Sequence, residues 1–171
     1  RTPADGQQKW QRALFKPFSA SDLPIWRGQY APTQRLLLLD EQAIGDCMMF
    51  VTLLPALLSE FKHIGLFVSP RLEAIYKRSF EQEILNQTVS IFTKDNLSDG
   101  SLRSSDFDFQ IPLGSTCQHR FTKLDSYAPR VPILKADEGL ALQLREVYLA
   151  NSTSNKRLIG ISWRGGGRGK R

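Results

Sequence analysis

The sequence has little cysteine and histidine, with two residues of each type in a chain of 171. Cys47 and Cys117 do not form a C-x-x-C pair, and neither lies at a standard metal-ligand spacing from His63 or His119. This distribution excludes the common cysteine-based zinc modules and gives no reason to expect a metal site. The simplest interpretation is two reduced, partly buried thiols in a protein of a reducing compartment.

Long apolar runs are absent from the sequence as well. No run reaches the roughly 18 residues that are needed to cross a bilayer. Residues 1–16 are polar and contain no apolar core of the kind that signal peptides have. We therefore expect no transmembrane segment and a cytoplasmic location.

Positive charge is concentrated at one end of the chain. The formal net charge is +6, and the last eight residues contribute Arg164, Arg168, Lys170 and Arg171 without any acidic residue. Without these four charges the rest of the chain carries only +2, so the electrostatic case for a nucleic-acid partner rests on the tail alone. The glycine-rich basic tail leaves an RNA-binding module open as an alternative. No aromatic basic platform in the rest of the chain supports it.

Short apolar runs alternate with helical patterns after residue 34. The runs are typical of strands covered on both faces, and they lie at 35–40, 64–68, 88–92, 107–111 and 158–163. Helical spacing predicts helices over 47–61, 71–80 and 137–150. Pro55 should kink or restart the first helix, and Asp137 is a candidate cap for the last. The polar stretch 94–106 predicts an exposed loop.

This alternation predicts a Rossmann-like α/β fold with a mostly parallel sheet and flanking helices. Hydrophobic and charged fractions of 41% and 23% are ordinary for a globular protein and exclude general disorder. The chain starts without methionine and stops just after an apolar run, so we expect a fragment of a longer protein. We divide it into a connector at 1–34 that packs on the domain, a Rossmann-like domain at 35–150, and a linker with the first strand of a truncated second domain at 151–171.

The turn after the first expected strand carries the strongest functional signal. It reads Glu41-Gln42-Ala43-Ile44-Gly45-Asp46, and ligands of parallel sheets bind beyond the carboxyl ends of the strands. Gly45 permits a close backbone approach. Asp46 fits a cap at the start of the next helix or a general base for an acceptor hydroxyl, while Glu41 fits a second site carboxylate or a solvated loop residue. The absence of G-x-G-x-x-G weighs against a dinucleotide site.

The same turn resembles a known family. The run Leu36-Leu37-Leu38-Leu39-Asp40 followed by this turn, and then a helix containing Leu53-Leu54-Pro55-Ala56-Leu57, resembles the heptosyltransferase-related glycosyltransferases of family 9. The similarity is greatest to the branch found behind tetratricopeptide repeats in bacterial proteins, where the turn commonly reads E-Q-G-L-G-D. Ala43 stands where that pattern has glycine, which makes this loop slightly less flexible.

Other segments resemble the family in the same order along the chain. Segments 9–12 and 23–28 are similar to the aromatic-basic and P-x-W-x-G stretches that join the repeats to the transferase. Segment 107–115 resembles the F-D-x-x-I-P-L-x-S strand and loop, and 131–135 resembles V-P-Y-L with Ile133 in place of tyrosine. Segment 159–163 resembles the G-L-V-W strand that opens the second domain. The similarity thus covers nearly the whole chain.

The resemblance implies the N-terminal half of a GT-B fold, in which two Rossmann-like domains face each other across the active site. In such enzymes the N-terminal domain holds the acceptor, and the C-terminal domain binds the nucleotide sugar without a metal or other cofactor. Asp46 matches the position taken as the catalytic base. The residues implied on the acceptor side are Glu41, Gln42, Gly45, Ser69, Arg71, Gly114 and Ser115.

The resemblance also implies partners and a donor side. The tail would face the donor through Trp163, Arg164, Gly165 and Arg168. The implied partners are a glycan, lipid or protein acceptor, a nucleotide sugar held by the second domain, and upstream tetratricopeptide repeats. The fragment alone is then expected to be inactive. Two alternatives stay open: Arg71 as a solvated first-turn helix residue, and the whole chain as a non-catalytic, transferase-like interaction domain.

Overall fold

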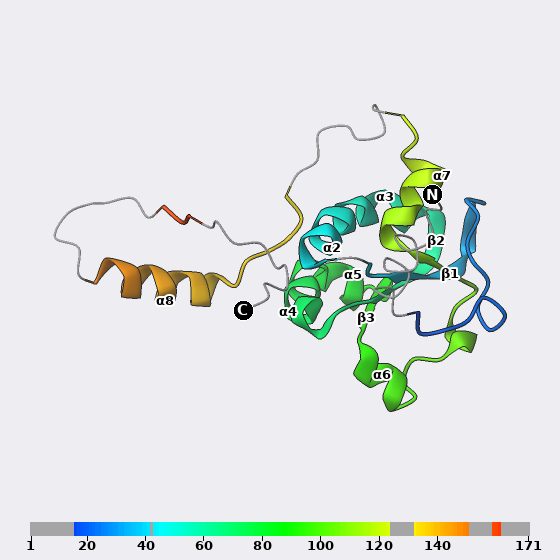
Figure 1. Cartoon of the computed structure of the whole chain (residues 1–171), viewed down its shortest axis with the longest axis horizontal. Coiled ribbons are helices and arrows are strands. Elements are labelled where there is room, and N and C mark those ends of the chain that lie inside the picture. Colours follow the sequence, from blue (N-terminus) through cyan, green and yellow to red (C-terminus); the bar gives the residue numbers. More distant parts are fainter. Residues whose placement is uncertain (1–15, 42, 124–131, 151–158, 162–171) are drawn as a thin grey trace, which may run out of the picture. The chain divides into compact units, whose positions relative to one another are not determined.

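The computed structural model describes residues 16–41, 43–123, 132–150 and 159–161. The chain divides into two compact units, Arg1–Leu134 and Lys135–Arg171. The first unit contains the sheet and its covering helices, and the second contains one helix (Figure 1). Each unit is described by itself below.

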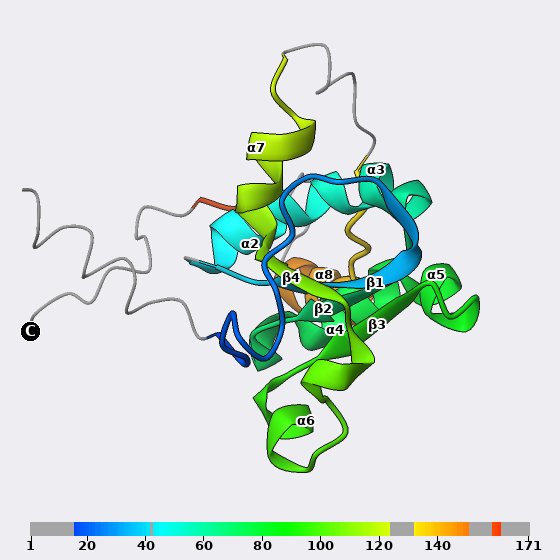
Figure 2. The ribbon, with the colours of Figure 1, turned by 90° about the vertical axis from the view of Figure 1, so that its right-hand side faces the viewer.

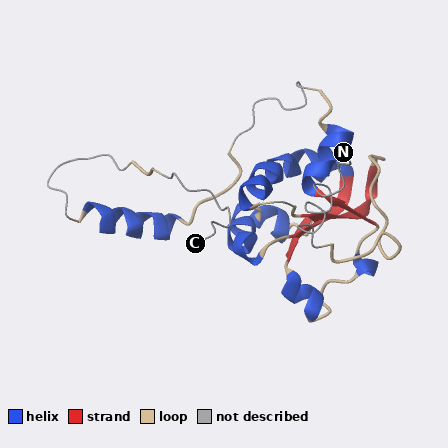
Figure 3. Ribbon diagram, in the orientation of Figure 1, coloured by secondary structure: helices blue, strands red, loops and turns tan. Residues whose placement is uncertain are grey.

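The sheet of the first unit has four parallel strands in the order β3-β2-β1-β4. The strands are β1 (Ala31–Leu39), β2 (Phe61–Phe67), β3 (Val89–Phe92) and β4 (Phe109–Pro112). Helices flank this sheet (Figure 3), which confirms the predicted Rossmann-like α/β fold. The chain adds β2 and β3 on one side of β1 and then returns to place β4 on the other side, so the strand order reverses between β1 and β4.

The four leucines at the end of β1 explain why this strand is central. Leu36 to Leu39 are fully buried, and successive side chains of a strand point to opposite faces. Leu36 and Leu38 belong to one buried cluster, whereas Leu37 and Leu39 belong to another. Both faces of the sheet are therefore covered, as the continuous apolar run predicted.

One face of the sheet is covered by the helices that connect β1 to β2 and β2 to β3. The first connection consists of α2 (Ile44–Phe50), the 3₁₀ turns η1 (Val51–Leu53) and η2 (Leu58–Glu60), and α3 (Leu54–Leu57) between them. The second consists of α4 (Pro70–Ser79) and α5 (Glu81–Leu85). Pro55 lies in the first turn of α3. A backbone N–H at this position would have no intrahelical acceptor, so the proline costs the helix no hydrogen bond there. The predicted restart of the helix at Pro55 is confirmed.

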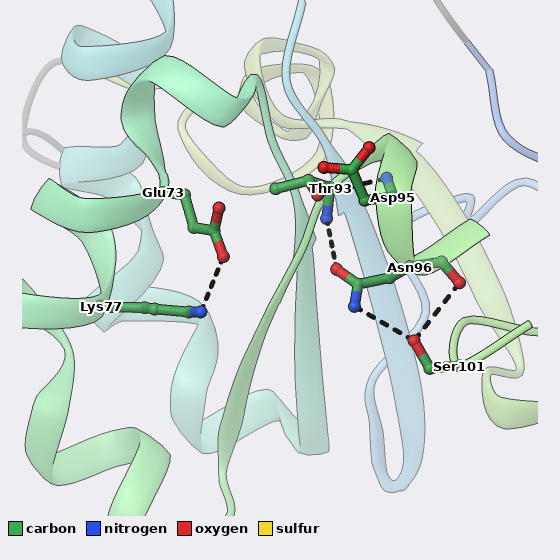
Figure 4. A network of polar contacts seen from close by, with 6 residues as sticks. All are labelled: Glu73, Lys77, Thr93, Asp95, Asn96 and Ser101. Atoms are coloured by element: carbon green, nitrogen blue, oxygen red, sulfur yellow. Dashed lines mark hydrogen bonds and ion pairs between the residues drawn. The ribbon is translucent and has the colours of Figure 1, made fainter. Parts of the chain in front are cut away.

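The connection from β3 to β4 covers the opposite face. It was expected to be an open loop over 94–106, but it contains the short helix α6 (Lys94–Ser98) and the 3₁₀ turn η3 (Ser104–Asp106). Thr93 caps α6 by accepting the N–H of Asp95, and Asn96 donates to Ser101 Oγ, which ties the loop together (Figure 4). Leu102 packs in the buried cluster beneath the sheet. The polar composition of this segment did not indicate that Leu102 would be buried.

Residues before β1 pack along the outer edge of β4. Ile25 forms a parallel bridge with Gln110, and the Gln110 side chain is fully buried. Its amide group, Nε2, donates to the carbonyl oxygens of Phe18, Ser19 and Leu23 at 3.2, 3.2 and 2.7 Å. The two N–H bonds of this amide are shared among three backbone carbonyls, and they hold this segment against the sheet.

The end of β4 continues into η4 (Leu113–Thr116) and α7 (Cys117–Arg120). Arg120 forms an ion pair with Glu60 at 2.5 Å and lies over the ring of the buried Trp26. Arg120 therefore covers one face of the Trp26 ring. Cys117 is half-buried and Cys47 is buried, and both are free thiols, as predicted.

The second unit contains α8 (Glu138–Leu149). Asp137 caps it by accepting the N–H of Leu140 at 2.9 Å, as expected. The apolar side chains of α8 are largely exposed, and they include Leu140, Leu142, Leu144, Val147 and Tyr148. Of the strand expected over 158–163, only residues 159–161 are described, and they form no strand. No helix among the described residues is long and apolar enough to cross a membrane.

Candidate functional site

The candidate site lies at the carboxyl edge of the sheet, which we define as the edge where all four parallel strands end (Figure 2). The turn at 40–46 leaves this edge after β1, and the η4 loop leaves it after β4. Leu39 pairs with Pro112, so the two loops start side by side. The strand order reverses between these two strands, and ligands of open α/β sheets commonly bind at such a reversal.

Asp46 is the third residue of α2 and is half-buried. Its Oδ2 accepts the backbone N–H of Ala43, the true N-cap residue, at 3.1 Å. Asp46 does cap the helix, as one interpretation predicted. It does so from the third helical residue and not from the N-cap position. Its second oxygen has no hydrogen-bond partner among the residues that the structure describes. One carboxylate thus stabilises the turn and still keeps an acceptor for another molecule.

Glu41 connects the loop that follows β1 with the loop that follows β4. Burial raises the pKa of its carboxyl group, and the backbone N–H groups of Gly114 and Ser115, which donate to it, oppose that shift. The nearby charge of Asp46 raises the pKa further. Glu41 is therefore half-buried and holds the start of η4 against the end of β1.

Gly114 has no side chain, and this leaves room for the Glu41 carboxylate. A Cβ atom at Gly114 would overlap the Glu41 carboxylate and the ring of Phe50, whereas a Cβ at Gly45 would meet nothing within 4 Å. We expect Gly114→Ala to lower the free energy of unfolding by about 1 to 3 kcal/mol, because the neighbours must shift. Gly45→Ala should be neutral or slightly stabilising. Urea unfolding of both variants tests this pair, and equal effects would contradict the match between Glu41 and Gly114.

Asp40 is a site residue that the sequence interpretation passed over. It follows β1 directly, and its Oδ2 accepts the N–H of Ser69 in the next loop at 3.4 Å. Burial raises the pKa of Asp40 to about 6, although the Ser69 N–H lowers it. Cys47 lies nearby and donates its thiol proton to the Glu41 carbonyl at 3.1 Å. A charged residue at the end of a fully apolar strand was the signal that could have identified Asp40.

The raised pKa of Asp40 makes the stability of the domain depend on pH. The folded protein binds this proton more tightly than the unfolded chain does, so the free energy of unfolding should fall as pH rises from about 4 to about 6. The expected fall is roughly 1 to 3 kcal/mol, the lower part of this range allowing for screening by water. Asp40→Asn should remove this contribution and be more stable than wild type above pH 6.

Chemical denaturation at several pH values between 4 and 7 measures that difference. Asp99→Asn is the control, because Asp99 is fully exposed and its pKa is lowered by hydrogen bonds from Ser101. The control should leave the slope between pH 4 and 6 unchanged. An Asp40→Asn protein with the wild-type slope would show that Asp40 does not titrate in this range.

Burial also raises the pKa of the Cys47 thiol to about 12, and the charge of Asp40 raises it further. The thiol therefore stays protonated and is not a nucleophile. No group of three or more metal-ligating side chains occurs within the described part of the chain. The polar side-chain groups described at this edge include carboxylates, hydroxyls and a guanidinium.

The remaining predicted residues fall into three groups. Ser69 and Ser115 lie at the starts of their loops, and within the described ranges their hydroxyl groups have no hydrogen-bond partner. Arg71 is exposed in the first turn of α4, and its guanidinium likewise has no partner there. The predicted residues outside the described part of the chain are Gln42, Trp163, Arg164, Gly165 and Arg168.

The structure thus brings Glu41, Gly114 and Ser115 into one contact and places Asp46 in the adjoining turn. Ser69 joins them through Asp40, whereas Arg71 extends from the neighbouring loop without touching the others. Such an edge can bind a polar molecule through hydroxyl groups and a cation and can accept a proton from it. No protein-family profile matches the chain, and comparison with curated proteins and with solved structures finds no match either.

Proposed function

We propose that the chain is the acceptor-binding half of a glycosyltransferase that uses a nucleotide-sugar donor. The observation that carries this proposal is the placement of Asp46. It lies in the turn after β1, at the point where the strand order reverses, with one oxygen engaged by Ala43 and the other free. The resemblance of the turn to the family 9 transferases supplies the reaction class.

In the proposed reaction, Asp46 accepts the proton of an acceptor hydroxyl as that oxygen attacks the anomeric carbon of the donor sugar. The bond between that carbon and the nucleotide diphosphate breaks, and the diphosphate leaves with the bonding electrons. The hydrogen bond from Ala43 restricts the carboxylate to one orientation, which is the condition that general-base catalysis places on geometry. The donor would be held by a second Rossmann-like domain.

Acceptor binding is assigned to groups that the fold leaves without partners. The hydroxyls of Ser69 and Ser115 and the guanidinium of Arg71 are the polar side-chain groups of this kind among the predicted site residues that the structure describes. Two hydroxyls suit a sugar or another polyol, and Arg71 suits an anionic group on the acceptor. Glu41 has a different part in this proposal, since its carboxylate positions Gly114 and Ser115.

Release of nucleotide from nucleotide sugars tests the proposal. We expect a protein that carries this chain together with a second Rossmann-like domain to release the nucleotide from one member of a panel of UDP-, GDP- and ADP-sugars, in the presence of bacterial glycans as acceptors. The 171-residue chain alone should release none. Sugar transfer by the isolated chain would contradict the assignment of only half a site to it.

The exposed apolar face of α8 favours a second candidate, a non-catalytic interaction domain. Leu140, Val147 and Tyr148 share one face by helical spacing and are each more than 50% exposed, and clustered apolar exposure is typical of protein contacts. The two candidates differ in what Asp46 does. A scaffold should keep all its interactions after Asp46→Asn, whereas a transferase should lose turnover.

A further inference from the structure

Two buried oxygen atoms beneath the site turn have no hydrogen-bond partner. They are Asp40 Oδ1, at the end of β1, and Tyr76 Oη, on α4. Tyr76 is fully buried, and the second carboxylate oxygen of Asp40 is already engaged by the Ser69 N–H. Leaving a hydroxyl and a carboxylate oxygen unsatisfied in a protein interior costs several kilocalories per mole, so such atoms usually have a partner.

The two side chains lie in neighbouring parts of the buried interior. Asp40 accepts the N–H of Ser69, the N-cap residue of α4, and Tyr76 packs in the same buried cluster as Cys47. Burial raises the pKa of the Tyr76 hydroxyl, and the negative charge of Asp40 raises it further, followed by Cys47. Burial, then Asp40 and finally Asp46 raise the pKa of the Cys47 thiol as well. Asp40 directly follows β1, Cys47 lies on α2 and Tyr76 lies on α4. The charged groups that act on these side chains are Asp40 itself and Asp46.

The chemistry of the cluster limits what can lie between these atoms. The Tyr76 hydroxyl can donate one hydrogen bond, and Asp40 Oδ1 can only accept while the carboxylate is charged. The Cys47 thiol already donates its proton to the Glu41 carbonyl, so its sulfur is left as a weak acceptor. A metal ion is a poor fit, because a single carboxylate oxygen faces it. A molecule that accepts once and donates up to twice fits every group present.

We propose that Asp40 and Tyr76 bind one internal water molecule, which accepts a hydrogen bond from Tyr76 Oη and donates one to Asp40 Oδ1. The second proton of the water is directed to the Cys47 sulfur. Buried waters typically make about three hydrogen bonds to groups that are otherwise unsatisfied, and this set supplies three. The water joins α4 to the end of β1 and thereby fixes the base of the turn that carries Asp46. The water site is independent of the proposed transferase function.

A crystal structure of the 171-residue chain at near-atomic resolution is the direct test. The expected result is a peak of water density within hydrogen-bonding distance of both Asp40 Oδ1 and Tyr76 Oη. A direct hydrogen bond between the two side chains, or an empty space between them, would overturn the proposal.

Titration of the Asp40 carboxyl carbon by NMR is the second test. In Tyr76→Phe the water loses its donor, so the charged form of Asp40 is less well solvated and its midpoint should rise by roughly 0.5 to 1 pH unit. Tyr30→Phe is the matched control, because it removes the same hydroxyl from a side chain that is 68% exposed. A midpoint that stays unchanged in a folded Tyr76→Phe protein would also overturn the proposal.

Discussion

Replacing Asp46 by asparagine in a two-domain form of this protein should lower kcat for sugar transfer by roughly 10²- to 10⁴-fold. Asparagine keeps a side-chain oxygen that can accept the Ala43 N–H, so the turn and the first residues of α2 should stay in place. The amide cannot accept a proton from an acceptor hydroxyl at neutral pH, so only the basic function is lost. Steady-state rates at saturating donor measure the effect.

Asp95→Asn is the matched control for this experiment. Asp95 lies in the first turn of α6, which follows β3 at the same carboxyl edge of the sheet, and it is exposed. Its replacement should leave kcat unchanged. An equal loss in both variants would point to a general electrostatic effect of this edge, and no loss in Asp46→Asn would remove Asp46 as the base.

The second large effect concerns stability and involves Gln110. Replacing this residue by leucine removes the amide that donates to the carbonyls of Phe18, Ser19 and Leu23, all on the segment that covers β4. The carbonyls of Phe18 and Leu23 would then lose this donor, whereas the Ser19 carbonyl still accepts the N–H groups of Asp22 and Leu23. We expect the free energy of unfolding to fall by about 2 to 4 kcal/mol. Urea unfolding followed by tryptophan fluorescence suits the measurement, because Trp26 is buried in the same segment.

Gln118→Leu gives the control for the Gln110 variant. Gln118 is exposed on α7, so its replacement by leucine makes the same chemical change at the surface of the protein. Its effect on the free energy of unfolding should stay within about 0.5 kcal/mol. If Gln110→Leu is no more destabilising than Gln118→Leu, the segment before β1 is not held by this side chain.

The sheet was predictable because its strands carry continuous apolar runs. All four observed strands coincide with predicted runs, and the alternation with helices was enough for the parallel Rossmann-like arrangement. The start of β1 was not predictable, because residues 32–35 are polar or only partly buried and extend the strand from Ala31 through pairing with β2. The structure of the α6 loop was not predicted for a related reason. Most of its residues are polar, and Leu102 is its anchor in the buried cluster.

The site was predictable only in part, because contacts between loops leave no local pattern in a sequence. The turn at 41–46 was identifiable from a glycine and two carboxylates after an apolar strand. The link between Glu41 and Gly114 depends on two residues that are distant in the chain and meet only through the pairing of β1 with β4. Tyr76 lies in a helix that was predicted, but the sequence does not indicate that its hydroxyl lies near Asp40.

The central claim is that Asp46 acts as the base of a sugar transfer, and rescue by a small acid anion tests it most directly. Asp46→Ala in the two-domain protein leaves space for formate, because Asp46 is only half-buried. We predict that this variant loses turnover and that added formate restores part of it, with no effect of formate on the wild type. Wild-type turnover in Asp46→Ala, or a loss that formate does not change, would contradict the claim.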